Sequence, residues 1–167
     1  KEYASYCSAG ANGISAVVQL YRTAANRRSE STVIQDFRFG YARYGIMTPW
    51  AADRPASGYT VDQWYQRGQH IIRRVRGQAY AIGIRIAAYD TLIEDCVLSD
   101  CGGAQEDPAT GSEFSRTFGI LLNGPNPTIR RTLIKRIKHG EYPVGQTQES
   151  VGLGFGADCH GGSIEDV

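Results

Sequence analysis

Short stretches of alternating apolar and polar residues recur along this chain, and five of them share one form. The form is an isoleucine, two polar residues, and then a small or apolar residue. It occurs at residues 32–37, 70–75, 91–98, 128–132 and 163–167, with its isoleucine at Ile34, Ile72, Ile93, Ile129 and Ile164. An internal repeat of this kind is the signature of a solenoid, in which each unit packs on its neighbours.

A second marker, a glycine followed by an aliphatic residue, comes after each of the first four units. These pairs are Gly45-Ile46, Gly83-Ile84, Gly119-Ile120 and Gly152-Leu153. Ile72 precedes Gly83 by 11 residues and Gly83 precedes Ile93 by 10, so the basic period is 21 residues. Gly13-Ile14 lies one period before Ile34, and we interpret it as the end of an earlier unit.

Longer spacings arise by insertion between these markers. Ile93 to Gly119 spans 26 residues and Ile129 to Gly152 spans 23, so two neighbouring units are expected to bulge at the same corner. The insertion between Gly45 and Ile72 falls at another corner. Insertions confined to loops are how a solenoid varies without losing its core.

The repeat unit reads as strands rather than helices. Its residues alternate with a period near two and are rich in Ile, Val, Phe and Thr, which favours β-structure. The leucine-rich-repeat signature, which has a similar length, does not occur. Short strands, glycine corners and a 21-residue period predict an all-β chain, a parallel β-helix of about five coils.

The two polar positions of the unit form two predicted columns of charge. The first column is Gln35, Arg73, Glu94, Arg130 and Glu165, and the second is Asp36, Arg74, Asp95, Arg131 and Asp166. Stacked strands lie about 4.7–4.9 Å apart, a spacing at which like charges repel and opposite charges stabilise by about 0.2–1 kcal/mol. We therefore expect a structural ladder with Arg74 between Asp36 and Asp95, and Arg131 between Asp95 and Asp166.

Composition narrows the function classes. The chain has 167 residues and a net charge of +1. The ladder accounts for four of its arginines, which argues against a nucleic-acid interface. No apolar run approaches the roughly 20 residues that a membrane span requires. The four cysteines form no CxxC pair, which excludes a zinc ribbon and leaves disulfide pairing open. Cys96 is expected to be a buried thiol, and Cys101 the likelier disulfide partner.

This pattern resembles the right-handed parallel β-helix repeats of the pectate lyase superfamily, over residues 13–167. The superfamily includes polysaccharide lyases, hydrolases, epimerases and phage tailspikes. The resemblance implies an extended, often acidic, polysaccharide as ligand and a place outside the cell or on a virion surface. It also implies a basic residue and calcium in a lyase, or paired carboxylates in a hydrolase. Arg136-Ile137-Lys138 and His160-Gly161 occur in the reverse of the polygalacturonase order, so no catalytic role is carried over from them.

The two insertions at the shared corner hold the candidate chemistry, because function in a solenoid gathers where loops leave the coil. The candidate catalytic residues are Asp107, Glu113, His139 and Glu141, and the candidate substrate-binding residues beside them are Arg116, Lys138 and Tyr142. Acids, a histidine and cations together suit acid–base catalysis on a uronate. Asp100, Glu106 and Asp107 offer oxygens for calcium. The alternative is that all of these are ordinary polar loop residues.

The insertion at the other corner carries Trp50, Trp64 and Tyr65, whose rings are suited to stacking on sugars. They could equally cover a flank of the solenoid.

Residues 1–167 are thus expected to form one β-helix segment, open at both ends and cut from a longer protein. The predicted function is binding, and cleavage or modification, of an acidic polysaccharide, with lyase and hydrolase both open. The alternative is a structural or receptor-binding segment of a phage tailspike or tail fibre, a homotrimer at full length. Because open coils recruit other chains, the isolated segment is expected to aggregate or to unfold without cooperativity.

Overall fold

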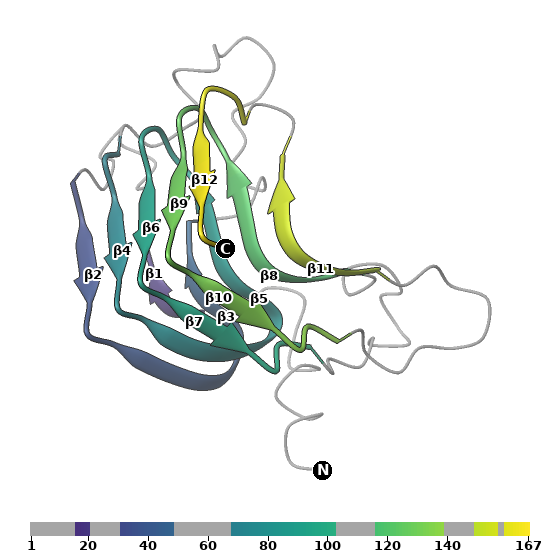
Figure 1. Cartoon of the computed structure of the whole chain (residues 1–167). Coiled ribbons are helices and arrows are strands. Elements are labelled where there is room, and N and C mark those ends of the chain that lie inside the picture. Colours follow the sequence, from purple (N-terminus) through teal and green to yellow (C-terminus); the bar gives the residue numbers. More distant parts are fainter. Residues whose placement is uncertain (1–15, 21–30, 49–67, 103–115, 139–148, 157–158) are drawn as a thin grey trace, which may run out of the picture.

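The computed structural model describes residues 16–20, 31–48, 68–102, 116–138, 149–156 and 159–167. Within these ranges every helix or strand assigned is a β-strand, and all the strand pairs are parallel. Figure 1 shows the strands stacked side by side, with the sequence advancing from one strand to the next across each layer.

One layer, which we call the front sheet, consists of five short strands. In spatial order they are β2 (Val33–Gln35), β4 (Ile71–Arg73), β6 (Leu92–Glu94), β9 (Thr128–Arg130) and β12 (Ser163–Glu165). Each comes from a different repeat unit, and together they form the left and central part of Figure 1. The front sheet is therefore built by the repeat that the sequence predicts.

Two further parallel layers complete each coil. One contains β3 (Arg38–Met47), β5 (Arg76–Ala87), β7 (Val97–Ser99) and β10 (Leu133–Lys135), and the other contains β1 (Ala16–Gln19), β3, β5, β8 (Arg116–Asn123) and β11 (Glu149–Phe155). The long strands β3 and β5 belong to both layers. Because the chain visits the three layers in turn, the arrangement is that of a parallel β-solenoid, as predicted.

The predicted isoleucine column lies in register across the front sheet. Ile34 pairs with Ile72, Ile72 with Ile93, Ile93 with Ile129, and Ile129 with Ile164. The three central members are fully buried, whereas Ile164, on the last described strand, is 52% exposed. The column is therefore confirmed, and its burial follows from being covered by a coil on each side.

The glycine markers also stack, and the spacing between coils explains why they are glycines. A Cβ atom on Gly83 would lie 2.6 Å from the carbonyl oxygen of Gly119, and one on Gly119 would lie 2.7 Å from that of Gly152. No side chain is accommodated at such distances. In the column of these markers, Val18 pairs with Ile46. The predicted marker Gly13-Ile14 lies outside the described residues.

Each strand of the front sheet ends at a corner in the left-handed backbone conformation. The corner residues are Asp36, Arg74, Asp95, Arg131 and Asp166, with φ between 46° and 54°. This conformation costs an L-residue about 1–2 kcal/mol and is adopted most readily by Gly, Asn and Asp. The second charge column is therefore also a column of tight corners, which places its side chains on the outside of the solenoid.

The isoleucine column yields a stability prediction with an internal control. Ile93→Ala should lower the free energy of unfolding by about 2–5 kcal/mol, because it leaves a cavity between two coils. Ile164→Ala, the same change at the exposed end of the column, should cost about 1 kcal/mol or less. Urea denaturation followed by circular dichroism measures both. Equal losses for the two variants would contradict the assignment of a shared interior.

Candidate ligand-binding groove

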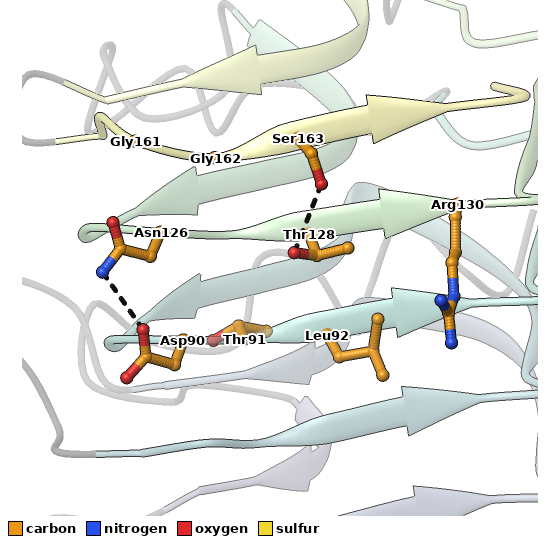
Figure 2. Close-up of a pocket in the computed structure, with 9 residues that line it drawn as sticks. All are labelled: Asp90, Thr91, Leu92, Asn126, Thr128, Arg130, Gly161, Gly162 and Ser163. Carbon is orange, nitrogen blue, oxygen red and sulfur yellow. Dashed lines mark hydrogen bonds between the residues drawn. The ribbon is translucent and has the colours of Figure 1, made fainter.

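A groove of about 430 Å³ crosses the outer face of the front sheet over β6, β9 and β12. Its lining residues are Asp90, Thr91, Leu92, Asn126, Thr128, Arg130, Gly161, Gly162 and Ser163. Figure 2 shows that they come from three successive strands and the corners that precede them. The groove therefore runs in the direction in which the coils stack.

Hydrogen bonds between neighbouring coils organise the polar side chains of the groove. The Asn126 Nδ2 group donates to Asp90 Oδ1 at 3.2 Å, and the Ser163 hydroxyl donates to Thr128 Oγ1 at 3.4 Å, as drawn in Figure 2. Asp90 and Asn126 are left-handed corner residues, whereas Thr128 and Ser163 begin their strands. Equivalent positions thus present equivalent polar groups on adjacent coils.

Two glycines keep one end of the groove shallow. Gly161 takes the left-handed corner with φ 69°, where the preceding coils have Asn126 and Asp90. A Cβ atom on Gly162 would lie 2.8 Å from Cδ of Pro127. The small residues are therefore required by the close approach of this corner to the coil below, and they leave the polar groups of β9 uncovered.

Arg130 lines the other end of the groove and is also part of the charge ladder. Its Nε and Nη2 atoms lie 2.9 and 2.8 Å from Glu94 Oε2, and Arg131 Nη2 lies 2.9 Å from the same oxygen. The Glu94 side chain is only 10% exposed. The pKa of Glu94 is held below its usual range although the side chain is nearly buried. The largest cause is the hydrogen bonding from Arg130, and the positive charges of both arginines add to it.

The second charge column stacks in the predicted order, and its ion pairs join each arginine to the aspartate of the preceding coil. Arg74 binds both carboxylate oxygens of Asp36 at 2.6 and 2.7 Å, and Arg131 binds those of Asp95 at 2.7 and 3.0 Å. The hydrogen bonds to Asp36 in the first coil, and to a smaller extent the charge of Asp95 in the next, raise the pKa of Arg74. The Arg131 amide donates to the Glu165 carbonyl at 3.0 Å. Both arginines therefore lie in coils between the predicted acidic neighbours.

Most sequence-predicted site residues lie outside the described residues: Asp107, Glu113, His139, Glu141, Trp50, Trp64, Tyr65 and Tyr142. Arg116 is the first residue of β8, and Lys138 is an exposed residue beyond β10. The Lys138 amide donates to the Cys101 carbonyl at 2.8 Å. The insertions that follow Gly102 and Lys138 therefore leave neighbouring coils at one corner, as predicted.

Asp100, the described member of the predicted calcium set, is engaged by an arginine. Arg136 Nε and Nη2 lie 2.6 and 2.7 Å from its two carboxylate oxygens. Glu106 and Asp107 lie outside the described residues. Within the described ranges, no three His, Cys, Asp or Glu side chains come together as a metal site would require. Within the described residues, Asp100 is thus held in an ion pair with Arg136.

The cysteines of the described part of the chain, Cys96, Cys101 and Cys159, are free thiols. Cys96 is buried, as predicted, and burial raises the pKa of its thiol to about 11, so it is unreactive near neutral pH. Cys101, predicted as a disulfide partner, is instead a fully buried free thiol in the core. The prediction placed it at the loop mouth, but its side chain is fully buried in the main core cluster.

Four residues of the groove are not among those predicted from the sequence: Asp90, Asn126, Thr128 and Ser163. They precede the isoleucine markers at fixed offsets: Thr128 and Ser163 by one residue, Asp90 and Asn126 by three. Extending the column alignment toward the N-terminal side of each marker would have found them. The charged positions that follow each marker are predictable because their sign alternates along the sequence.

The nearly buried member of the charge ladder, Glu94, predicts a pH dependence. The pKa of Glu94 is lowered in the folded protein, so its charged form stabilises the fold above its ordinary pKa of 4.5, and this stabilisation is lost as the pH falls through the lower folded-state value. Glu94→Gln should therefore be less stable than the wild type at pH 7, with the difference shrinking toward pH 3. Urea titrations across this range measure it.

Glu165→Gln serves as the control, since Glu165 has no ion pair within the described part of the chain. Its stability should follow the wild type at every pH. If the difference in unfolding free energy between Glu94→Gln and the wild type stays constant with pH, the charge ladder is not the source of that difference.

No described segment forms a helix with the length and apolarity that a membrane span requires. Comparison of the chain with protein-family models, with curated protein sequences and with solved structures finds no match.

Proposed function

We propose that this chain is a right-handed parallel β-helix segment of the pectate lyase type that binds an extended acidic polysaccharide across β6, β9 and β12. The observation that carries the proposal is the groove on the front sheet, whose polar groups repeat from coil to coil. Folds of this class host many functions, so the argument rests on the groove and not on the architecture.

An extended polymer is the ligand that best matches a periodic groove. Equivalent side chains on adjacent coils lie about 4.7–4.9 Å apart. A chain lying across the strands would therefore meet a hydroxyl from Thr128 and then one from Ser163, and an amide or carboxylate from Asn126 and Asp90. Hydroxyl, amide and carboxylate groups are suited to the hydroxyls of sugars, since each can donate, accept or both.

Arg130 gives the groove its preference for acidic sugars. Its guanidinium group has five N–H donors in a planar fork, and Glu94 engages only Nε and Nη2. The Arg130 side chain is 39% exposed. The remaining donors can therefore bind a uronate carboxylate at the end of the groove, while Leu92 offers an apolar surface to the sugar ring.

Cleavage or modification of the polymer is part of the proposal and rests on the predicted loop residues Asp107, Glu113, His139 and Glu141. Their two insertions leave adjacent coils at Gly102 and Lys138. A lyase would generate an unsaturated product that absorbs at about 235 nm, whereas a hydrolase would release reducing ends without that absorbance, so one incubation with each polymer separates the two reactions.

Arg130→Gln tests the proposed ligand. Affinity electrophoresis in gels containing polygalacturonate should show binding by the wild type and about tenfold weaker binding by the variant, the loss expected for one charge-assisted hydrogen-bonded contact. A neutral glucan should retard both proteins less. Arg136→Gln removes an arginine from an equivalent ion pair outside the groove and should bind as the wild type does. Equal weakening by both substitutions would place the ligand elsewhere.

The charge ladder favours a second proposal, a structural segment of a tailspike or fibre. The arginines of the ladder pair mainly with carboxylates of the same chain, as in Arg74–Asp36 and Arg131–Asp95, which stiffens a rod without requiring a ligand. Failure to bind any polymer of a panel, with the Ile93→Ala result as expected, would favour this proposal over the first.

A further inference from the structure

The polar residues on three successive strands of the front sheet change sign together from coil to coil. Each coil has them at three equivalent positions: the left-handed corner before the strand, the last residue of the strand, and the left-handed corner after it. They are Gln69, Arg73 and Arg74 in the coil of β4, Asp90, Glu94 and Asp95 in that of β6, and Asn126, Arg130 and Arg131 in that of β9. An acidic coil therefore lies between two basic coils.

Two arginines of this face lie two coils apart in one column. Arg73 pairs in register with Glu94, and Glu94 pairs with Arg130. Each guanidinium group binds the side chain one coil earlier. Arg73 binds Gln35 Oε1 at 2.9 and 2.6 Å, and Arg130 binds Glu94 Oε2 at 2.9 and 2.8 Å. Because both groups are displaced by one coil in the same direction, they remain about 9.5 Å apart, twice the strand spacing.

Both arginines retain donors for a ligand. The partner of Arg73 is the neutral amide of Gln35, and within the described part of the chain Arg73 joins no ion pair. Arg130 is 39% exposed and shares the Glu94 carboxylate with Arg131. Since a guanidinium group has five N–H donors, each of the two arginines can bind a further carboxylate.

The coil between these arginines disfavours a ligand carboxylate. Figure 2 shows Asp90 at the opposite end of the groove from Arg130. Asp90 is exposed and accepts a hydrogen bond from the Asn126 amide, and among the described residues it has no ion-pair partner. A ligand carboxylate over β6 would lie between the Asp90 and Glu94 carboxylates, and like charges at this spacing repel. The middle coil therefore selects a neutral group.

We propose that the polysaccharide recognised here carries a carboxylate on every second sugar, with neutral sugars between, and that Arg73 and Arg130 bind two successive carboxylates. This inference rests on the proposed function and extends its binding surface from β6 to β4, where Ile71 takes the place of Leu92. One pyranose unit of an extended chain advances by a length comparable with one coil spacing, so alternate sugars match alternate coils. An extended peptide repeats its same-face side chains about every 6.6–6.8 Å, which does not match this spacing.

Two oligosaccharides of equal length test the proposal. One is a hyaluronan hexasaccharide, in which glucuronate alternates with neutral N-acetylglucosamine, and the other is hexagalacturonate, in which every sugar is charged. Isothermal titration calorimetry of the full 167-residue chain at low salt should show about tenfold tighter binding of the hyaluronan hexasaccharide. The order is diagnostic, because attraction to net charge alone would favour hexagalacturonate, which carries twice as many carboxylates.

Substitutions assign this preference to individual residues. Arg73→Gln and Arg130→Gln should each weaken binding of the hyaluronan hexasaccharide about tenfold. Arg76→Gln is the matched control, since Arg76 is an exposed arginine of β5 outside the front sheet, and this variant should bind as the wild type does. Asp90→Asn should strengthen binding of hexagalacturonate about two- to fivefold, with a smaller effect on the hyaluronan hexasaccharide.

The possible failures are distinguishable. Absence of binding to both oligosaccharides would overturn the proposed function and this inference with it. Equal or tighter binding of hexagalacturonate, with Arg130→Gln still weakened, would overturn the inference alone. Wild-type binding of the hyaluronan hexasaccharide by Arg73→Gln would also overturn it, because the second carboxylate would then lie elsewhere.

Discussion

Every feature of this structure depends on the stacking of one coil on the next at the spacing of hydrogen-bonded strands. At about 4.7–4.9 Å, each side chain is in contact with its equivalents above and below, so a position must suit a whole column and not one residue. Ile93 is buried between Ile72 and Ile129, and Gly83 is a glycine because Gly119 approaches too closely for a Cβ atom. The sequence repeats because every coil must satisfy this constraint.

The corner residues adopt a strained backbone conformation and also form the ion pairs between stacked coils. Arg74 and Arg131 adopt the left-handed conformation that their aspartate neighbours tolerate more easily. Each arginine binds both carboxylate oxygens of the aspartate one coil earlier. Exposed ion pairs contribute little to stability, so we infer that their main effect is on register: a slip by one residue would separate these pairs and move Ile72 out of the core.

The sequence predicts the columns well because similar residues recur in them, whereas the groove positions change in residue type from coil to coil, as from Leu92 to Thr128 and from Asn126 to Gly161. Three periodicities of the sequence recur in the observed register: the isoleucines from Ile34 to Ile164, the Gly-Ile markers and the Asp–Arg alternation. Cys101 was misjudged because its burial depends on where the chain turns after Asp100, which no period encodes. The groove needs Gly161, Asn126 and Asp90 at one corner, a juxtaposition that appears only when the coils are stacked.

Arg130 belongs to both the ladder and the groove, and the geometry allows it to serve both. One carboxylate oxygen of Glu94, Oε2, accepts hydrogen bonds from both arginines. Nε of Arg130 and Nη2 of Arg131 each lie 2.9 Å from it. Arg130 can therefore turn some of its donors toward a ligand while the nearly buried carboxylate keeps a charged partner. If binding drew Arg130 away from Glu94, an Arg130 that was its sole partner would leave the carboxylate unpaired, at a cost of about 1–3 kcal/mol or more. The second arginine thus removes the penalty that would otherwise oppose binding.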